Sequence, residues 1–205
     1  KNDMFCGCIR CREVQGDCTM VDVAELVVRK YESSGGTEYF ISIESGNDNT
    51  HRLVDGKWYD MARKQVPGIM YGFLRLRLVN NTRNKYFDEL RNAALIRELH
   101  VYGQVVSKTT DEELGNHIQS KGFGKLMMQK AEEIAMNNYY TKIAVISGIG
   151  VREYYRNIGY KDVNTFMMKT ISYGEMIRYH INLNEWQIFM ILLTLYFHIF
   201  NLKID

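Results

Sequence analysis

One stretch constrains the fold of this chain more than any other: an apolar strand, a glycine-rich turn, a helix and a second apolar strand in succession. The first strand is Ala94–Tyr102, the turn is Gln119-Ser120-Lys121-Gly122-Phe123-Gly124, the helix is Lys121–Asn138 and the second strand is Lys142–Ser147. The second strand is a short continuous apolar run, which is typical of a strand buried on both faces. Two strands joined through a helix are expected to be parallel. The sequence therefore predicts an α/β fold.

The glycine-rich turn has a composition suited to binding phosphate. The first turn of a helix leaves several backbone N–H groups without an intrahelical partner, and these groups, with the positive end of the helix dipole, attract phosphate. Gly122 and Gly124 lack the side chains that would keep a pyrophosphate away from the backbone. Glycine turns at helix starts are common, so an ordinary loop-to-helix turn is the alternative interpretation.

Residue periodicity and composition predict the remaining elements. Further strands are predicted over Val21–Tyr31 (or a short helix and then a strand), Thr37–Glu44, Ile69–Val79 and Tyr160–Met168. A short helix is predicted over Val151–Asn157, and exposed polar connections over Ser45–Gln65 and Asn80–Asn92. The first two strands are expected to form a hairpin, and the third alternates leucines with arginines. In the long helix, the stripe facing the core is predicted to be Phe123, Leu126, Met127, Ala131 and Ile134.

Two pairs of residues are candidates for acid–base chemistry. Glu98 and His100 are two apart on one strand, so their side chains leave the same face and can share a proton transfer. A half-exposed strand with polar residues outward is the alternative. Tyr154 and Tyr155 lie on the short helix, where a phenol can hydrogen-bond a thioester or protonate a leaving thiolate. The alternative is one core tyrosine and one surface tyrosine.

Three cysteines lie close together near the start of the chain. Cys6, Cys8 and Cys11 have the spacing C-x-C-x-x-C, and a tight turn can present three thiolates to one zinc ion. Cys18, or a residue upstream of Lys1, is the candidate fourth ligand. Reduced surface cysteines are the alternative. Such close spacing does not suit a disulfide framework, which points to a reducing compartment.

Charge does not identify a partner on its own. The net charge is +2, and the composition, with 46% hydrophobic and 24% charged residues, is that of a globular protein with a substantial core. Between Arg52 and Arg97 there are ten lysines and arginines against four acidic residues. This local excess fits either an RNA-binding surface or a solvated loop.

Six blocks of sequence, taken in order, carry a family resemblance. They are Cys8–Val14, Gly72–Arg77, Ile96–Gly103, Lys121–Gly124, Lys142–Gly148 and Arg152–Tyr160. Together they resemble the C-terminal half of the catalytic subunit of the Elongator complex, from about Cys6 to Lys169. The order and wording of the blocks go beyond a general signature of the GNAT acetyltransferases.

The resemblance implies a GNAT acetyltransferase fold, with a mixed, mostly antiparallel twisted sheet and flanking helices, and it implies acetyl-CoA binding. It also implies a role in modifying the wobble uridine of tRNA toward a carboxymethyl group at C5, with tRNA and other Elongator subunits as partners. In that family a radical-SAM domain, with an iron–sulfur cluster and S-adenosylmethionine, precedes this segment. No residue of this chain is assigned to that cluster.

Carried over position by position, the resemblance assigns the site residues in three sets. The backbone of Glu98, Leu99, His100 and Val101 would pair with the pantetheine arm of acetyl-CoA, and Tyr155, with Tyr154, would lie beside the thioester. Gln119, Gly122, Phe123, Gly124 and Lys125 would hold the pyrophosphate. Cys6, Cys8 and Cys11 would form the zinc site of the family.

Three segments are expected: a cysteine-rich zinc segment over residues 1–20, a GNAT domain over 21–170 and an extension over 171–205 that ends in an apolar helix. The run from Ile188 to Phe200 is near the lower length limit for a membrane span, so a tail anchor is one interpretation and a docked helix is another. The chain begins at Lys1 without an initiator Met and is interpreted as part of a longer protein. It is expected in the cytoplasm, on an intracellular membrane if anchored, with a nuclear pool.

Three functions remain open from the sequence. The first is the acetyl-CoA-binding half of a tRNA wobble-uridine modifying enzyme. The second is a protein lysine N-acetyltransferase in which Glu98 acts as base through water. The third is a non-catalytic module that binds tRNA or partner subunits.

Overall fold

The computed structural model describes residues 6–15, 19–79, 86–102 and 122–172, and the single residues 174, 190, 193, 194 and 196. The strands of its large sheet are β1 Glu25–Ser33, β2 Gly36–Ser45, β6 Ile69–Leu78, β7 Ala93–Val101, β8 Lys142–Ile146, β9 Lys161–Val163 and β10 Phe166–Thr170. The helices are α1 Ile9–Arg12, α3 Phe123–Asn137 and α4 Arg152–Asn157, with the 3-10 helices η1 Val21–Val23, η2 Asp88–Leu90 and η3 Ile149–Val151. The small sheet consists of β3 Arg52–Val54, β4 Lys57–Tyr59 and β5 Gln65–Val66.

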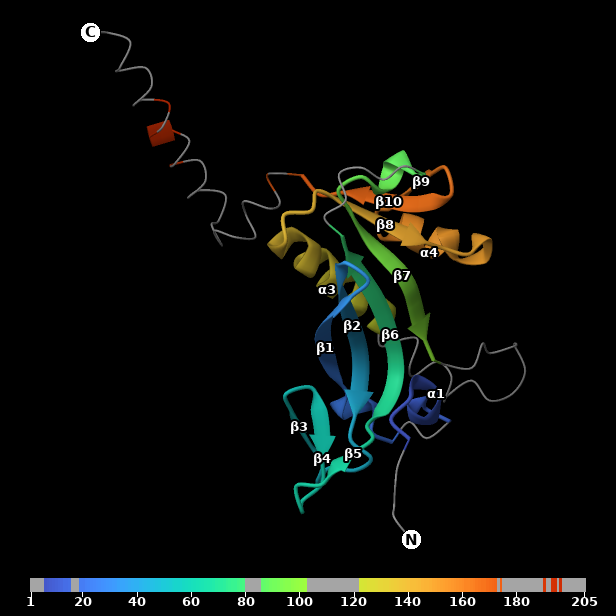
Figure 1. Ribbon diagram of the computed structural model, residues 1–205, viewed down its shortest axis with the longest axis vertical. Coiled ribbons are helices and arrows are strands. Elements are labelled where there is room, and N and C mark those ends of the chain that lie inside the picture. Colours follow the sequence, from blue (N-terminus) through green and yellow to red (C-terminus); the bar gives the residue numbers. More distant parts are fainter. Residues whose placement is uncertain are drawn as a thin grey trace.

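The large sheet has the strand order β1-β2-β6-β7-β8-β10-β9 (Figure 1). Only the neighbours β7 and β8 are parallel, and every other neighbouring pair in this sheet is antiparallel. The predicted mixed, mostly antiparallel sheet is therefore confirmed, and so is the parallel pair that the helical connection requires. This is the arrangement expected of a GNAT domain.

The first three strands of the sheet follow the sequence pattern closely. β1 and β2 form the predicted hairpin, whose turn places Ser34 and Gly35 at φ values of 47° and 72°. In β6, Leu74 and Leu76 are fully buried in the core, while Arg75 and Arg77 leave the opposite face. The alternation of leucine and arginine thus identified both the strand and the face that is buried.

Helix α3 covers the leucine side of the sheet. Its buried residues are Phe123, Met127, Met128, Ala131, Ile134 and Ala135, which pack on residues of β2, β6, β7 and β8. The prediction for Leu126 was wrong, because this side chain is 44% exposed. Positions 127, 128, 131, 134 and 135 have the spacing of one helical face, and position 126 lies beside that face.

The stretch between β2 and β6, predicted as an exposed connection, contains the small antiparallel sheet β3-β4-β5. Trp58, at the centre of β4, is 5% exposed. Strands of two or three residues carry too few alternations to give a periodic signal, so the sequence did not reveal them. Figure 1 shows this sheet at the end of the large sheet where β2 ends and β6 begins.

The last predicted strand, Tyr160–Met168, is in fact two strands. β9 and β10 pair with each other in an antiparallel arrangement, and Asn164 takes a positive φ of 53° in the turn between them. Asparagine tolerates this left-handed conformation better than most residues, so a hairpin turn fits here. β10 also pairs with β8, which places the hairpin beyond the parallel pair.

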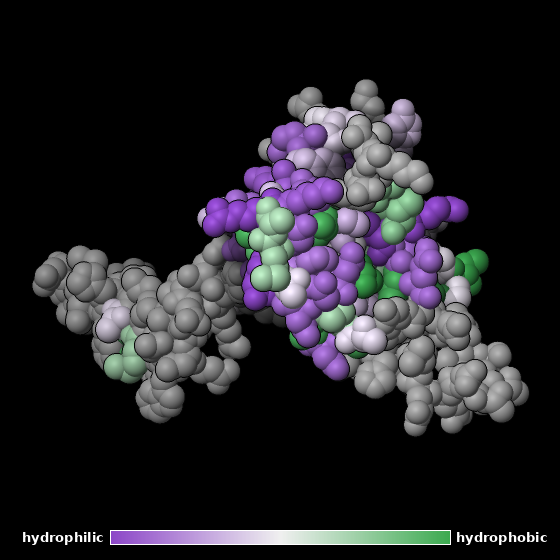
Figure 2. Space-filling view, turned by 90° about the horizontal axis from the view of Figure 1, so that it is seen from below, coloured by the Kyte–Doolittle hydropathy of each residue, from purple (hydrophilic) through white to green (hydrophobic). Residues whose placement is uncertain are grey.

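Among the described residues, no helix is both long enough and apolar enough to cross a membrane. Most of the apolar run over residues 188–200 lies outside the described residues, and so do Gln119 and Cys18. Seen from below, the described surface mixes many hydrophilic side chains with scattered hydrophobic ones (Figure 2).

Candidate functional site

The parallel strands β7 and β8 pair over only part of the length of β7. The register runs from Ala93 opposite Lys142 to Ile96 opposite Val145, and β7 then continues to Val101 without pairing to β8. The β6–β7 register shifts directly after Ile96, so Arg97 is an additional residue in β7. An additional residue of this kind bends a strand. In Figure 1 the two strands lie side by side at one end and diverge toward the other.

The parted edge of β7 presents backbone hydrogen-bonding groups. The N–H of Tyr102 donates to the carbonyl oxygen of Tyr71 on the β6 side at 2.9 Å. Because these groups alternate in direction along a strand, the N–H and C=O of Leu99 and Val101 point away from β6, toward the side of β8. No described strand pairs with them there. An extended ligand with amide groups can hydrogen-bond to this edge as another strand would.

The first turn of α3 lies next to this edge. Gly122 precedes the helix at φ 70° and ψ 23°, a left-handed conformation that favours glycine. The first helical hydrogen bond is donated by Leu126 N–H to Gly122 O, so the amides of Phe123, Gly124 and Lys125 have no intrahelical acceptor. A Cβ added at Gly124 would lie 2.9 Å from Tyr154 Oη and 3.5 Å from Val101 Cγ2. Gly124 therefore adjoins both β7 and α4.

The two neighbouring tyrosines of α4 have different surroundings. Tyr155 is buried in the core, its ring packs 6.1 Å from that of Tyr160, and burial raises the pKa of its hydroxyl to about 12. Tyr154 is half-buried, and its Oη is a buried atom with no hydrogen-bond partner among the described residues. Burial raises the pKa of Tyr154 above its ordinary value, so its hydroxyl is a proton donor at neutral pH.

A second buried hydroxyl was missed from the sequence. Ser147 follows directly after β8, and its Oγ is also buried without a hydrogen-bond partner among the described residues. An unpaired buried hydroxyl costs free energy, so such groups often mark a place where a ligand completes the hydrogen bonding. No local motif marks this serine in the sequence. Only its position at the end of β8 in the folded chain distinguishes it from other serines.

Glu98 and His100 leave the same face of β7, as predicted, because they are paired with Arg75 and Phe73 on β6. This is the face opposite helix α3, where both side chains are exposed. The Glu98 carboxylate lies 3.8 Å from Arg75 Nη1, and the His100 ring packs on Phe73 and Tyr102 at 6.0 and 4.6 Å between centroids. Each of these two candidate bases therefore already contacts another side chain on this face of the sheet.

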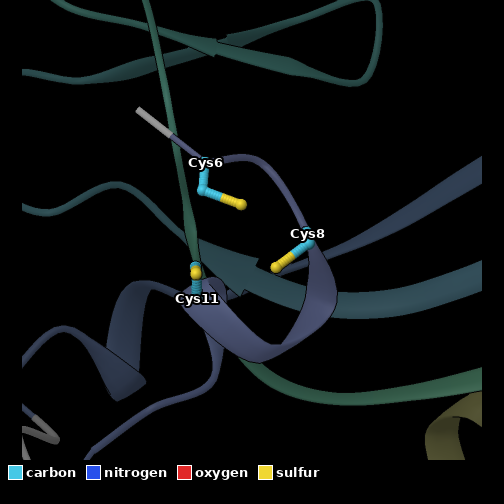
Figure 3. A group of neighbouring side chains, drawn as sticks. All are labelled: Cys6, Cys8 and Cys11. Carbon is cyan, nitrogen blue, oxygen red and sulfur yellow. The ribbon is translucent and has the colours of Figure 1, made fainter. Parts of the chain in front are cut away.

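The three cysteines converge at the turn that leads into α1 (Figure 3). The sulfur atoms of Cys6, Cys8 and Cys11 all lie within 4.8 Å of one another. Zinc–sulfur bonds of about 2.3 Å in a tetrahedron place the sulfurs about 3.8 Å apart, so small movements suffice to bind one ion. The three side chains are exposed and form no disulfide.

The cysteine thiols also differ in acidity. Hydrogen bonds from the Cys11 backbone and then from the Cys6 and Cys11 side chains lower the pKa of Cys8 to about 7. Hydrogen bonds to Cys8 and Cys6 raise the pKa of Cys11 to about 11. A metal ion therefore deprotonates Cys8 at less cost than Cys11.

Comparisons with known proteins support the family resemblance. No protein-family model matches the chain. The tRNA uridine(34) acetyltransferase of Methanocaldococcus jannaschii is 37% identical over 177 residues, which is 82% of this chain and 28% of that protein. Elongator complex protein 3 of Bos taurus is 37% identical over 148 residues, 72% of this chain and 23% of that protein.

A solved structure gives the same result. The archaeal Methanocaldococcus infernus Elp3 with an N-terminal deletion superposes with a TM-score of 0.55 at 34% sequence identity, over 82% of this chain and 36% of that one. The chain spans only 28% and 23% of the two curated relatives described above. This chain is homologous to part of Elongator complex protein 3 and of the archaeal tRNA uridine(34) acetyltransferases.

Proposed function

We propose that this chain is the acetyl-CoA-binding part of an enzyme that modifies the wobble uridine of tRNA. The cofactor lies where β7 and β8 part, its pantetheine arm hydrogen-bonds to the edge at Leu99 and Val101, and its pyrophosphate lies on the first turn of α3. The single observation that carries this proposal is the buried Tyr154 hydroxyl beside Gly124, at the parted strands, which has no hydrogen-bond partner in the part of the chain that the structure describes.

Chemically, the arrangement suits activation of a thioester. The amides of Phe123, Gly124 and Lys125, which have no intrahelical acceptor, neutralise pyrophosphate charge, with Gln119 as the further ligand implied by the resemblance. The Tyr154 hydroxyl donates a hydrogen bond to the thioester or a proton to the departing thiolate. Tyr155 then serves to support the position of Tyr154, since the rings pack 5.2 Å apart in an edge-to-face arrangement. Glu98 and His100 face the other side of the sheet.

tRNA is expected to stimulate acetyl-CoA hydrolysis by this chain. The archaeal relatives are named for uridine 34 of tRNA, which supports RNA as the acceptor that completes the site. The measurement is thioester cleavage with and without tRNA, with a tRNA lacking uridine at the wobble position as control. Acetyl transfer to lysine peptides, together with no effect of tRNA, would establish the lysine acetyltransferase instead. Failure to bind acetyl-CoA at all would support the non-catalytic module.

We also propose that Cys6, Cys8 and Cys11 bind one structural zinc ion. The convergence of their sulfurs supports this proposal, as does the tetrahedral preference of zinc for thiolates. The fourth ligand is either Cys18 or a residue outside this chain. The extension over residues 171–205 and its membrane interpretation stay a prediction, as does the assembly with other Elongator subunits.

Replacing Cys8 by serine is expected to reduce bound zinc from about one ion per chain to a small fraction of that. Loss of one thiolate leaves two of the three described ligands, which no longer define a closed site. Elemental analysis of the purified chain is the measurement, and Cys18→Ser is its companion. Retention of zinc in Cys18→Ser places the fourth ligand elsewhere. Unchanged zinc in Cys8→Ser refutes the site.

A further inference from the structure

Glu44, near the end of β2, is a fully buried carboxylate whose two oxygens both accept several hydrogen bonds. Oε1 accepts from Arg29 Nη1 and from Ser42 Oγ, each at 2.6 Å, and Oε2 accepts from Arg29 Nη2 at 2.9 Å. Burial raises the pKa of the Glu44 carboxyl, but the Arg29 hydrogen bond, the Arg12 charge and Ser42 together hold it below its usual value. The group is therefore a buried anion, and its position is set by its partners.

The cysteine segment is attached to this carboxylate. Arg12, which follows Cys11 directly, forms an ion pair from Nη2 to Glu44 Oε2 and donates Nε–H to Gly68 O at 3.1 Å. A second attachment follows at once, because Val14 N–H donates to Met70 O at 3.0 Å. The orientation of α1, and with it that of the three thiols, is thereby fixed relative to β2 and β6.

The small sheet is attached to the same oxygen. The indole Nε1–H of Trp58 donates to Glu44 Oε2 at 3.2 Å, and Arg29 donates from Nε and Nη2 to Gly56 O at 3.0 and 2.5 Å. Trp58 also lies so close to Gly68 that an added Cβ there would be 2.4 Å from the ring. Glu44 Oε2 thus forms an ion pair with Arg12 and accepts a hydrogen bond from Trp58, and both of these residues also lie against Gly68.

We propose that Glu44 is a positioning residue that couples metal binding at Cys6, Cys8 and Cys11 to the seating of Trp58 and the small sheet. This inference rests on the zinc site proposed above. A bound ion fixes α1 and therefore Arg12. Arg12 in turn fixes the positions of Glu44 Oε2, to which the Trp58 indole donates its hydrogen bond, and of Gly68, against which the indole packs. Without the ion, α1 is oriented by the Arg12 and Val14 contacts to the sheet alone, so the shared geometry of Arg12 and Trp58 becomes less rigid.

Coupling of this kind is reciprocal, which gives two independent measurements. All proteins are the full 205-residue chain carrying Trp186→Phe, so that Trp58 is the sole tryptophan. The first measurement is quenching of Trp58 fluorescence by acrylamide, with zinc bound and after chelation. We expect quenching to increase on chelation. In Arg12→Met, in which Arg29 still neutralises Glu44, we expect quenching to be the same with and without zinc.

The second measurement is zinc affinity, obtained by competition with a chromogenic chelator. Trp58→Phe keeps the aromatic ring and removes only the indole donor, and it is expected to weaken zinc binding about fivefold. Tyr59→Phe, the next residue of β4, is the matched control and leaves the affinity unchanged. If the parent chain binds no zinc, the metal site itself fails. If zinc binds, but neither Trp58 quenching nor the Trp58→Phe affinity responds, the coupling is refuted while the metal site stands.

Discussion

Replacing Gly124 by leucine is expected to weaken acetyl-CoA binding by about 100-fold or more while the chain stays folded. In the proposed complex the backbone at this position approaches the pyrophosphate, and an added side chain would occupy that space. Its Cβ alone would lie 2.9 Å from Tyr154 Oη and 3.5 Å from Val101 Cγ2. Leucine forms helix more readily than glycine, so α3 itself does not suffer from the change. The expected loss therefore comes from blocked ligand contacts and from displacement of the Tyr154 hydroxyl, and not from unfolding of the helix.

Isothermal titration with acetyl-CoA measures this effect, and thermal unfolding of the free chain checks that the fold persists. Gly124→Ala is expected to be intermediate, because one methyl group displaces the Tyr154 hydroxyl without covering the amides. Gly174→Ala is the matched control, since the nearest atom to its Cβ is Ser172 Oγ at 3.9 Å. Wild-type affinity in Gly124→Leu would show that the pyrophosphate does not lie on this turn.

The strands and the helix around the site could be predicted because the patterns that identify them are local in the sequence. The alternation of Leu74 and Leu76 with arginines identifies β6, and the strand–turn–helix–strand succession requires the parallel pair of β7 and β8. From these two facts it follows that Glu98 and His100 share a face. Each inference needs only chain direction and side-chain period. The parting of β7 from β8 beyond Ile96 does not follow from them, since it coincides with the additional residue Arg97, which no sequence pattern marks.

The features that the sequence did not predict depend on contacts between segments that are far apart in the sequence. Trp58 is buried against segments distant in the sequence, Glu44 and Gly68 among them, and a three-residue strand is too short to show a periodicity that would predict this contact. Tyr154 and Tyr155 are adjacent, and the family resemblance put Tyr155 first beside the thioester, but the sequence alone does not show which of the two lies in the core. Consecutive helical residues point about 100° apart, and only the docking of α4 decides which hydroxyl reaches Gly124. The structure supports Tyr154 for this place and puts Tyr155 in the core.

Replacing Tyr154 by phenylalanine is expected to lower kcat for acetyl-CoA hydrolysis by about 100-fold, with KM little changed. The substitution removes only a buried hydroxyl that has no hydrogen-bond partner among the described residues. In the proposed mechanism this hydroxyl stabilises the developing charge and does not contribute to cofactor binding. The hydroxyl acts as a donor while protonated, and burial raises the pKa of Tyr154 above its ordinary value of 10.0. Wild-type activity should therefore persist to pH values above 10.0 before it falls as the phenol ionises, and Tyr154→Phe should lack that fall.

The variant Tyr155→Phe shows whether the loss of a tyrosine hydroxyl affects the reaction or only the packing of the core. Its ring stays in the core, so kcat should remain within a few-fold of the wild-type value, and only the free energy of unfolding is expected to change, by about 1 kcal/mol. Steady-state kinetics across the alkaline range, with thermal unfolding of each variant, distinguish the two tyrosines. If Tyr155→Phe loses kcat and Tyr154→Phe does not, the thioester lies by the other hydroxyl and α4 must dock differently in the complex. If neither variant loses kcat, the hydrogen-bond donor to the thioester is another group. Ser147 is then the next residue to replace, because its Oγ is the second buried hydroxyl without a partner among the described residues.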